Sequence, residues 1–387
     1  MKIFIIAGEA SGDKLGAAMM KGFEQHISHK LEFIGVGGAL MEEIGLKSLF
    51  PMEEISLMGI SEILSQYRHL KKRIRQTASA VLDEKPDVLI TIDLPEFSFR
   101  VADLVKQTYD IPTAHYVAPT VWAWRPGRAR KIAKYIDHVL ALFPFEPPLM
   151  QDAGMSCDFV GHPVVQDLIA TPQEVSEFKS HFGLNSGPIL VCLPGSRRSE
   201  IKRLTPIFQN SLAKVKDSYP DMNIVLPATP SVAELVQSEV RQWTHKPIVL
   251  DPREFNLDQA GKFKRASFKA ADVALAASGT VSLELAINQT PMVVAYDMNW
   301  ISRQIIGRML QVDSVNLVNL VSDTRTVPEY IGEACQPDAI ASAICDVLKN
   351  PTAQFQSMQS TVDRLKAPFS TPGSCAAKSV LDFLKNR

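Results

Sequence analysis

A strand-like run, a turn of small residues and the start of a helix follow one another twice in this chain, once in each half. The first copy begins at Lys2 and reads KIFIIAGEASGD, and the second begins at Ile189 and reads ILVCLPGSRRSE. The apolar, β-branched runs are typical of parallel strands that are buried on both faces. Glycine and serine let backbone amides approach a ligand, and the helix that follows adds its positive dipole end. We therefore expect an anion, such as a diphosphate or a carboxylate, at each turn.

Length and composition favour two lobes of an ordinary globular protein. The chain has 387 residues, and domains commonly hold about 150. A formal net charge of −1 with 21% charged residues excludes a disordered chain and a broadly basic protein, so we expect no nucleic-acid partner. The first residues form a strand and not a leader, and no apolar run approaches the roughly 18 residues of a membrane span, which predicts a cytoplasmic location. The five cysteines lack C-x-x-C spacing, so we expect buried thiols and no metal site.

Strand-like runs alternate with helical stretches in both halves, which predicts an α/β fold of two doubly wound sheets. The runs are Leu31–Val36, Val88–Ile92, Thr113–Val117 and Val139–Phe143, followed by Ile189–Leu193, Asn223–Leu226, Ile248–Leu250, Val273–Ala276 and Met292–Ala295. We expect an N-terminal Rossmann-like lobe over residues 1–165, a C-terminal Rossmann-like lobe over 166–340 and closing C-terminal helices over 341–387. The linker is expected at Phe159–Val164, where Gly and Pro interrupt the pattern. Because such sheets bind ligands beyond the carboxyl ends of their strands, the lobes should face a central cleft.

In the second half, charged residues follow two of the predicted turns. Arg197 and Arg198 come directly after the glycine turn, and a guanidinium there suits a bound phosphate. A merely solvated pair is disfavoured, because cations are unfavourable at a helix N-terminus without an anion. A third turn, Ala276–Glu284, reads AASGTVSLE and repeats the scheme. Glu284 lies one helical turn inside, where it either accepts hydrogen bonds from a ribose diol or serves as a capping or surface residue.

In the first half, four acids lie at predicted strand ends: Glu9, Asp13, Asp93 and Glu96. A carboxylate there can remove the proton from a hydroxyl nucleophile. For Asp93 the alternative is a turn or N-cap residue, a common place for Asp close to Pro. The segment His115–Arg125 reads HYVAPTVWAWR, and its two tryptophans either pack in the core or line a sugar-binding wall. The spacing of these residues alone does not show which of the four acids is the base.

Six segments together resemble one family. They are AGEASGD (Ala7–Asp13), MGISEIL (Met58–Leu64), HYVAPTVWAWR (His115–Arg125), FVGHP (Phe159–Pro163), LPGSRRSEI (Leu193–Ile201) and ASGTVSLE (Ala277–Glu284). In this order they resemble the lipid-A-disaccharide synthases, bacterial hexosyltransferases of lipopolysaccharide assembly. The resemblance implies a GT-B fold and an inverting transfer that needs neither metal nor cofactor. The donor would be UDP-2,3-diacylglucosamine and the acceptor 2,3-diacylglucosamine 1-phosphate, giving a β-1,6-linked disaccharide and UDP.

The resemblance also implies a set of site residues. The substrate-binding residues would be Ser11, Gly12, Gly195, Ser196, Arg197, Ser278, Gly279, Thr280, Glu284 and Asn319. The family's base lies in an Asp-rich segment that corresponds here to Ile92–Phe97. The second acid of that segment is Glu96 in this chain, and Asp93 and Glu9 remain the other candidates for the base. The family's SLPN stretch reads NLVN here, ending at Asn319 and lacking the proline.

The segment Met58–Leu82 has the pattern of a basic amphipathic helix. Apolar residues recur at helical spacing, and five cations lie among them: Arg68, Lys71, Lys72, Arg73 and Arg75. Such a helix suits an anionic bilayer surface, and the alternative is a core-facing helix with a solvated basic side. The resemblance favours a peripheral location on the cytoplasmic face of the inner membrane. Ser61 and Ser65 replace bulkier residues of the family, which predicts weak attachment; a homodimer is left open.

Other functions share parts of these patterns. A UDP-GlcNAc epimerase, or another lipid-linked UDP-sugar glycosyltransferase of the same fold, would use the same UDP cradle. A dinucleotide-dependent oxidoreductase is disfavoured, because the first turn reads GEASG instead of G-x-G-x-x-G. In addition, the predicted second strand runs into glycines, where such an enzyme needs an acid for the ribose.

Overall fold

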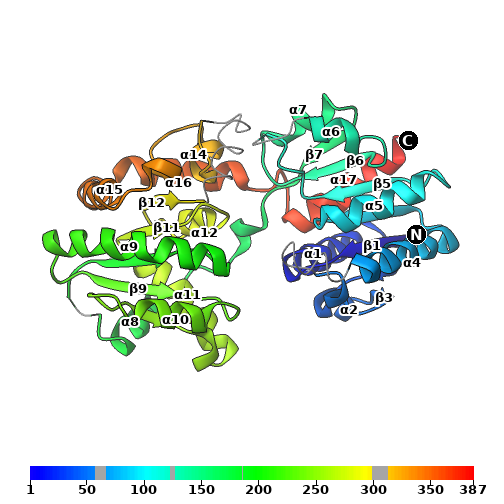
Figure 1. Cartoon of the computed structure of the whole chain (residues 1–387). Coiled ribbons are helices and arrows are strands. Elements are labelled where there is room, and N and C mark those ends of the chain that lie inside the picture. The colour runs from blue at the N-terminus through cyan, green and yellow to red at the C-terminus, as the bar shows by residue number, and fades with distance from the viewer. Residues whose placement is uncertain (57–66, 123–126, 185, 299–312) are drawn as a thin grey trace. The chain divides into compact units, whose positions relative to one another are not determined.

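The computed structural model of the chain describes residues 1–56, 67–122, 127–184, 186–298 and 313–387. These residues form two compact units, Met1–Pro163 with Leu365–Arg387, and Val164–Arg364. In each unit the described strands form a parallel sheet, and helices cover both of its faces (Figure 1). The prediction of two doubly wound α/β sheets is therefore confirmed.

The sheet of the first unit has the order β3-β2-β1-β4-β5-β6-β7 among the described residues. Its strands are β1 (Lys2–Ala7), β2 (Glu32–Val36), β3 (Lys47–Ser48), β4 (Val88–Ile92), β5 (Thr113–Tyr116), β6 (His138–Ala141) and β7 (Ser156–Phe159). The order reverses direction between β1 and β4, which pair with Ile3 opposite Val88. Open α/β sheets bind ligands at the carboxyl edge of such a switch point.

The helices of the first unit are α1 (Ala10–His26), α2 (Ala39–Glu43), α4 (Tyr67–Glu84), α5 (Pro95–Lys106), α6 (Gly127–Ile132), α7 (Glu146–Gln151) and α17 (Pro372–Lys385). Helices α4 to α7 cover one face, where Ile74 and Phe97 share a core with Phe4 of β1. Strand side chains alternate between faces, so Ile3 and Ile5 point to the opposite side, against α1.

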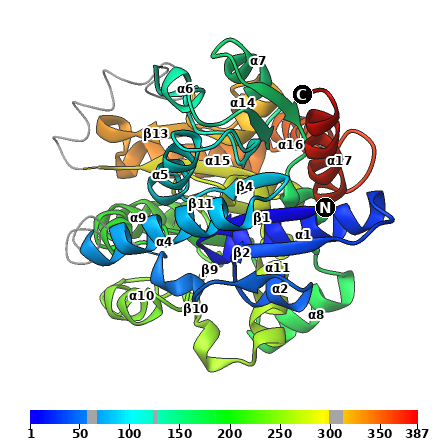
Figure 2. The ribbon, with the colours of Figure 1, turned by 90° about the vertical axis from the view of Figure 1, so that its right-hand side faces the viewer.

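The last helix, α17, returns to the first unit and packs along α1, as the red and blue helices of Figure 2 show. Two glycines permit this approach. A Cβ at Gly22 would lie 2.6 Å from the carbonyl oxygen of Gly373, and a Cβ at Gly373 would lie 2.4 Å from that of Ala18. The ring of His26 also lies 3.0 Å from the Ser374 hydroxyl. The end of the chain is thus part of the N-terminal core.

The sheet of the second unit has the order β10-β9-β8-β11-β12-β13 in the part of the chain that the structure describes. Its strands are β8 (Ile189–Leu193), β9 (Asn223–Pro227), β10 (Ile248–Leu250), β11 (Val273–Ala276), β12 (Met292–Tyr296) and β13 (Glu329–Ile331). Here β8 and β11 flank the switch point, with Leu190 opposite Val273. The turns after these two strands therefore meet at one edge of the sheet.

The helices of the second unit are α8 (Pro172–His181), α9 (Arg198–Ser218), α10 (Ala233–Val240), α11 (Leu257–Ala270), α12 (Val281–Ile287), α14 (Leu317–Ser322), α15 (Pro337–Lys349) and α16 (Thr352–Leu365). Helices α9, α10 and α15 bury Phe208, Val236 and Ile344 in one core. Helices α8, α11, α12, α14 and α16 share a second core, which contains Phe178 and Met358.

Two further features concern membrane-spanning helices and the cysteines. No helix in the described ranges combines the length and the apolar character needed to cross a bilayer. Four of the five cysteines are buried and Cys345 is partly buried, and all five thiols are free. The cysteines therefore behave as small apolar residues, as their spacing predicts.

Candidate active site

The turn after β8 is shaped by Gly195, which adopts a φ of +114°. A Cβ there would lie 2.4 Å from Oε2 of Glu200, so a side chain is excluded by space as well as by backbone conformation. Arg197 is the N-cap residue of α9, and its side chain is 78% exposed. The turn thus presents Ser196 and Arg197 at the start of a long helix.

The backbone amides of this turn are bound by a carboxylate of the same helix. Glu200 Oε2 accepts hydrogen bonds from the amides of Ser196 at 3.0 Å and Arg197 at 3.2 Å. Its Oε1 accepts from the Arg197 guanidinium at 2.9 Å. In this structure a carboxylate of the protein itself binds the amides at which we expect a ligand anion. A phosphate at the same amides would have to displace Glu200.

A cavity of about 670 Å³ lies in the second unit, at the carboxyl edge of its switch point. The turns after β8 and β11 both line it, and seven of the predicted residues lie on its wall: Gly195, Ser196, Arg197, Ser278, Gly279, Thr280 and Glu284. Apolar side chains, among them Phe255 and Phe263, supply part of the remaining wall. Such a mixture of an apolar wall and convergent polar groups is typical of a site for a small polar ligand.

Glu284 lies on the wall of this cavity, in the first turn of α12. Its carboxylate forms an ion pair of 2.7 Å with Lys264 of α11, whose ammonium lies 5.5 Å from the ring centroid of Phe268. The carboxylate thus lies on the cavity wall, where hydroxyl groups can donate hydrogen bonds to it. Lys264 also lines the cavity, and the sequence patterns did not single it out.

Asn319 lies elsewhere, buried in α14. Its amide donates to the carbonyl oxygen of Val327 at 2.9 Å and to Glu329 at 3.1 Å, while its own oxygen accepts from the Val327 amide at 3.0 Å. These bonds hold the segment before β13 in place. Asn319 therefore does not line the cavity, although α14 packs against α12 and the Ser278 hydroxyl donates to the carbonyl oxygen of Val315, just before α14, at 3.5 Å.

In the first unit, the turns after β1 and β4 touch each other. A Cβ at Gly8 would lie 2.2 Å from Cδ2 of Leu94, so the two turns approach closely. Asp93 and Leu94 adopt φ values of +50° and +48°, a left-handed conformation that strains a leucine. Burial raises the pKa of Asp93. Glu9, the N-cap residue of α1, lies at the same edge of the sheet.

The remaining predicted residues of the first turn take different places. Ser11 is exposed in the first turn of α1, whereas Gly12 is buried against Ala7 and Ile92. Asp13 is buried, and its carboxylate accepts hydrogen bonds from the amides at the start of α2: Gly38 at 2.9 Å, Leu40 at 3.0 Å and Met41 at 3.1 Å. Of the four acids, Asp13 thus has a structural role.

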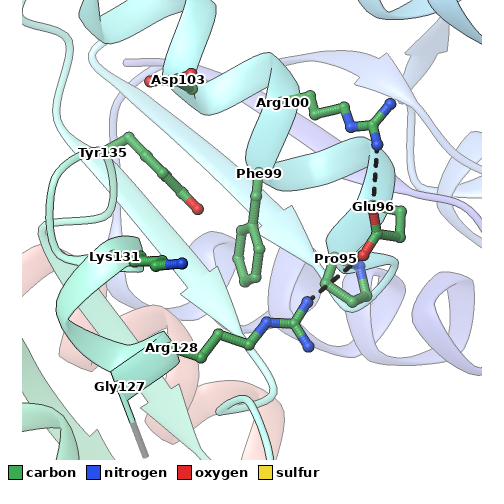
Figure 3. A pocket seen from close by; sticks show the side chains of 9 residues that line it. All are labelled: Pro95, Glu96, Phe99, Arg100, Asp103, Gly127, Arg128, Lys131 and Tyr135. Carbon is green, nitrogen blue, oxygen red and sulfur yellow. Dashed lines mark hydrogen bonds and ion pairs between the residues drawn. The ribbon is translucent and has the colours of Figure 1, made fainter. Parts of the chain in front are cut away.

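Glu96 lies in the first turn of α5, three residues after Asp93, and lines a second cavity of about 600 Å³. Its side chain is 65% exposed and forms ion pairs with Arg100 at 3.3 Å and Arg128 at 3.8 Å. The close-up in Figure 3 shows both pairs. Glu96 is therefore accessible to a ligand from solvent, in surroundings that differ from those of Asp93.

The aromatic loop is described only in part, because 123–126 lie outside the described residues. Trp122 is partly buried, packs edge-on against Phe145 and donates to Glu146 at 3.3 Å. Burial raises the pKa of Glu146 to about 8. In the described ranges, no three His, Cys, Asp or Glu side chains gather as metal ligands.

Helix α4 covers the described part of the basic amphipathic segment, and Met58–Leu64 lie outside the described residues. Its apolar face, including Leu70 and Ile74, is buried in the core of the first unit. Arg73 forms an ion pair with Glu54. The other cations of the helix are exposed: Arg68, Lys71, Lys72 and Arg75. Over this range the helix is core-facing with a solvated basic side.

Comparison with known proteins gives one consistent result along the chain. Residues 3–380 match the family model described as lipid-A-disaccharide synthetase. A lipid-A-disaccharide synthase of Ruegeria pomeroyi is 54% identical over 384 residues, which cover 99% of this chain and 96% of that protein. One of Rhodospirillum centenum is 43% identical, covering 100% of this chain and 95% of that protein.

Solved structures of similar fold are more distant in sequence. A UDP-GlcNAc 2-epimerase of Neisseria meningitidis, bound to UDP-GlcNAc, has a TM-score of 0.60 at 14% identity, covering 100% of both chains. A glycosyltransferase of Rickettsia africae has a TM-score of 0.57 at 12% identity, covering 100% of this chain and 97% of that one. At such identities the likeness concerns the fold, which is that of the GT-B glycosyltransferases and epimerases.

Proposed function

The chain belongs to the lipid-A-disaccharide synthase family, and from that premise we propose how its residues divide the reaction. The enzyme transfers 2,3-diacylglucosamine from UDP-2,3-diacylglucosamine to the 6-hydroxyl of 2,3-diacylglucosamine 1-phosphate. The products are the β-1,6-linked lipid A disaccharide and UDP. In an inverting transfer, the acceptor oxygen attacks the anomeric carbon while the bond to UDP breaks, and a base takes the hydroxyl proton.

The UDP part of the donor binds in the cavity of the second unit. The observation that carries this assignment is the meeting of two glycine turns, after β8 and β11, on one cavity wall at the switch point. Arg197 and the amides around Ser278 stabilise the negative charge that develops on departing UDP. Glu284 accepts hydrogen bonds from the ribose hydroxyls, and its ion pair with Lys264 holds the Glu284 carboxylate in place.

The base that activates the acceptor comes from the first unit. Glu96 is favoured, because its exposed carboxylate lines a cavity large enough for part of a sugar ring. Asp93 is the alternative, since burial raises its pKa and so makes it a stronger proton acceptor. Glu9 lies at the same sheet edge, and Ser11 and Gly12 follow it at the start of α1. The proton of the 6-hydroxyl moves to one of these carboxylates as the new glycosidic bond forms.

Peripheral attachment to the cytoplasmic face of the inner membrane fits the diacylated substrates, which reside in a bilayer. The exposed cations of α4 supply a charge that attracts anionic lipids. The apolar residues of α4 between Leu70 and Val81 do not insert, because they are core residues. Over this helix the attachment is electrostatic and reversible.

The decisive experiment measures UDP release and disaccharide formation by the purified protein in detergent micelles containing EDTA. UDP-2,3-diacylglucosamine is supplied with and without 2,3-diacylglucosamine 1-phosphate. Acceptor-dependent UDP release with a disaccharide product supports the synthase and its independence of metal. Epimerisation of UDP-GlcNAc supplied alone, without transfer to the acceptor, would favour the epimerase instead. Light scattering of the same preparation decides between a monomer and a homodimer.

A further inference from the structure

The cavity beside Glu96 is built by two helices of the first unit. Its wall consists of Pro95, Glu96, Phe99, Arg100 and Asp103 of α5, Gly127, Arg128 and Lys131 of α6, and Tyr135. Figure 3 shows Lys131 and the Tyr135 hydroxyl on one side of the Phe99 ring, Glu96 and Arg100 on the other, and the Arg128 guanidinium near the end of the ring. The hollow therefore combines an aromatic floor with a ring of positive charge.

Arg128 is positioned by contacts that reach the centre of the sheet. Its guanidinium lies 5.9 Å from the ring centroid of Phe99, and Phe99 packs at 4.6 Å against the ring of His115. His115 lies in β5, and its Nδ1 is 2.7 Å from the hydroxyl of Thr91 in β4. A guanidinium held in this way loses less conformational freedom when it binds a ligand than a freely rotating side chain does.

The cations of the wall are only weakly neutralised. Glu96 pairs with Arg100 at 3.3 Å and with Arg128 at 3.8 Å, and these exposed ion pairs stabilise little. Three cations face two acids, Glu96 and Asp103, on the wall. A phosphate monoester carries nearly two negative charges and three acceptor oxygens, and guanidinium groups bind such oxygens in pairs. A phosphate therefore competes effectively with Glu96 for both arginines.

We propose that this cavity binds the phosphate of the acceptor, with Arg128 and Lys131 as its ligands and Arg100 as a third cation. This assignment rests on the proposed function, since the acceptor carries a 1-phosphate. Binding transfers the arginines from Glu96 to the phosphate and leaves the Glu96 carboxylate available to accept a proton. The 1-phosphate and the 6-hydroxyl belong to one hexose ring, so a phosphate beside Arg128 keeps the hydroxyl near the acids of this sheet edge.

The test compares two acceptors, 2,3-diacylglucosamine 1-phosphate and 2,3-diacylglucosamine without phosphate. The wild-type protein should prefer the phosphorylated acceptor. Arg128→Gln and Lys131→Gln should each raise the KM of that acceptor by about tenfold or more, because a charge-assisted hydrogen bond is lost. The KM of the UDP-sugar should change little, and the preference for the phosphorylated over the unphosphorylated acceptor should shrink. Arg130→Gln is the matched control, an exposed cation of α6 that does not line the cavity.

An equal loss with both acceptors in Arg128→Gln and Lys131→Gln would overturn the assignment, as would an equal effect of Arg130→Gln.

A second measurement does not depend on turnover. Glucosamine 1-phosphate is titrated calorimetrically into the protein saturated with UDP, and Arg128→Gln should weaken this binding while glucosamine itself binds no better than background. If inorganic phosphate binds as tightly as glucosamine 1-phosphate, the site is a general anion site and the acceptor assignment is wrong. A wild-type protein that binds glucosamine 1-phosphate but forms no disaccharide would contradict the proposed function alone.

Discussion

The carboxylate of Glu200 accepts a hydrogen bond of 3.0 Å from the backbone amide of Ser196, inside the glycine turn that lines the cavity of the second unit. A protein side chain therefore takes the position that the sequence pattern assigns to a ligand anion. Oε1 of the same carboxylate also pairs with the Arg197 guanidinium. A phosphate that binds these amides has to break the two hydrogen bonds between them and Glu200 and overcome the repulsion between two anions.

Glu200→Gln tests this competition. The amide side chain keeps the shape of the turn but removes its negative charge, so UDP should bind several-fold more tightly to the variant. The affinity is measured by calorimetric titration of UDP at low and high salt, and the gain should shrink at high salt because charge repulsion is screened. An unchanged affinity would mean that the diphosphate binds at the turn after β11 and leaves Glu200 in place.

Arg197 and Arg198 are adjacent and exposed, but only Arg197 lines the cavity. Arg197→Ala should weaken UDP binding by about tenfold to a hundredfold and lower the transfer rate as well, because it removes a charge-assisted hydrogen bond to a phosphate. Arg198→Ala is the control and should retain near-normal UDP binding. Equal losses in both variants would indicate a general electrostatic effect of this helix start.

Glu96→Gln should lower kcat by about 10²- to 10⁴-fold, the usual contribution of a general base. UDP binding should be preserved, since Glu96 belongs to the first unit and the cavity that we propose for UDP belongs to the second. Asp93→Asn and Glu9→Gln are measured in parallel by the same disaccharide assay. Near-normal turnover by Glu96→Gln would assign the base to whichever of these two variants is inactive.

The exposed lysines of α4 provide a test of membrane attachment. Lys71→Gln and Lys72→Gln should each weaken binding to vesicles containing phosphatidylglycerol by about fivefold, and high salt should abolish the difference. Lys30→Gln, an exposed cation outside α4, is the control. Sedimentation with vesicles measures the bound fraction. Binding that resists both salt and these substitutions would indicate apolar insertion by another segment.

The buried histidine of β5 makes stability depend on pH. Burial and the nearby Arg128 lower the pKa of His115 to about 3 from 6.5, so the folded chain stays unprotonated at pH values where the unfolded chain binds a proton. The free energy of unfolding should therefore fall as pH drops below about 6.5, by up to about 1.4 kcal/mol per pH unit for this one group. Burial also lowers the pKa of His138, to about 4, and this group acts in the same direction.

His115→Gln should make the acid-induced loss of stability shallower without removing it, since His138 remains. Denaturant midpoints at about pH 7 and about pH 5 measure the difference for both proteins. If the variant loses as much stability on acidification as the native chain does, other groups cause the dependence.

The central strands and the glycine turns that follow them were predictable from the sequence. The runs Val88–Ile92, Ile189–Leu193 and Val273–Ala276 have the same bounds in the structure as in the prediction. Each is a run of apolar residues, interrupted only by the buried Thr91, because a central parallel strand is buried on both faces. The strands β3, β7 and β13 were missed, since edge strands are short and half-covered and carry no such run.

Contacts between segments that are distant in the sequence decide which side chains are buried and which share a site, and the sequence patterns do not show this. Only the tertiary structure shows that the apolar face of α4 is buried in the core and that Asp13 caps α2. The same holds for the cavity of the second unit, where the turn Gly195–Arg197 meets Ser278 and Glu284. Helix α17, expected among closing helices, packs on α1 because Gly22 and Gly373 leave room for its backbone.

The sequence by itself determined the family, the two sheets and the glycine turns after their central strands, because these depend on local periodicity and on the residue types that a turn permits. The tertiary structure alone decided which charged groups share a cavity, such as Arg128 with Glu96, and which already bind each other, such as Glu200 with the Ser196 amide. The physical reason is that charge interactions depend on distance in space and on burial, and neither is encoded in spacing along the chain.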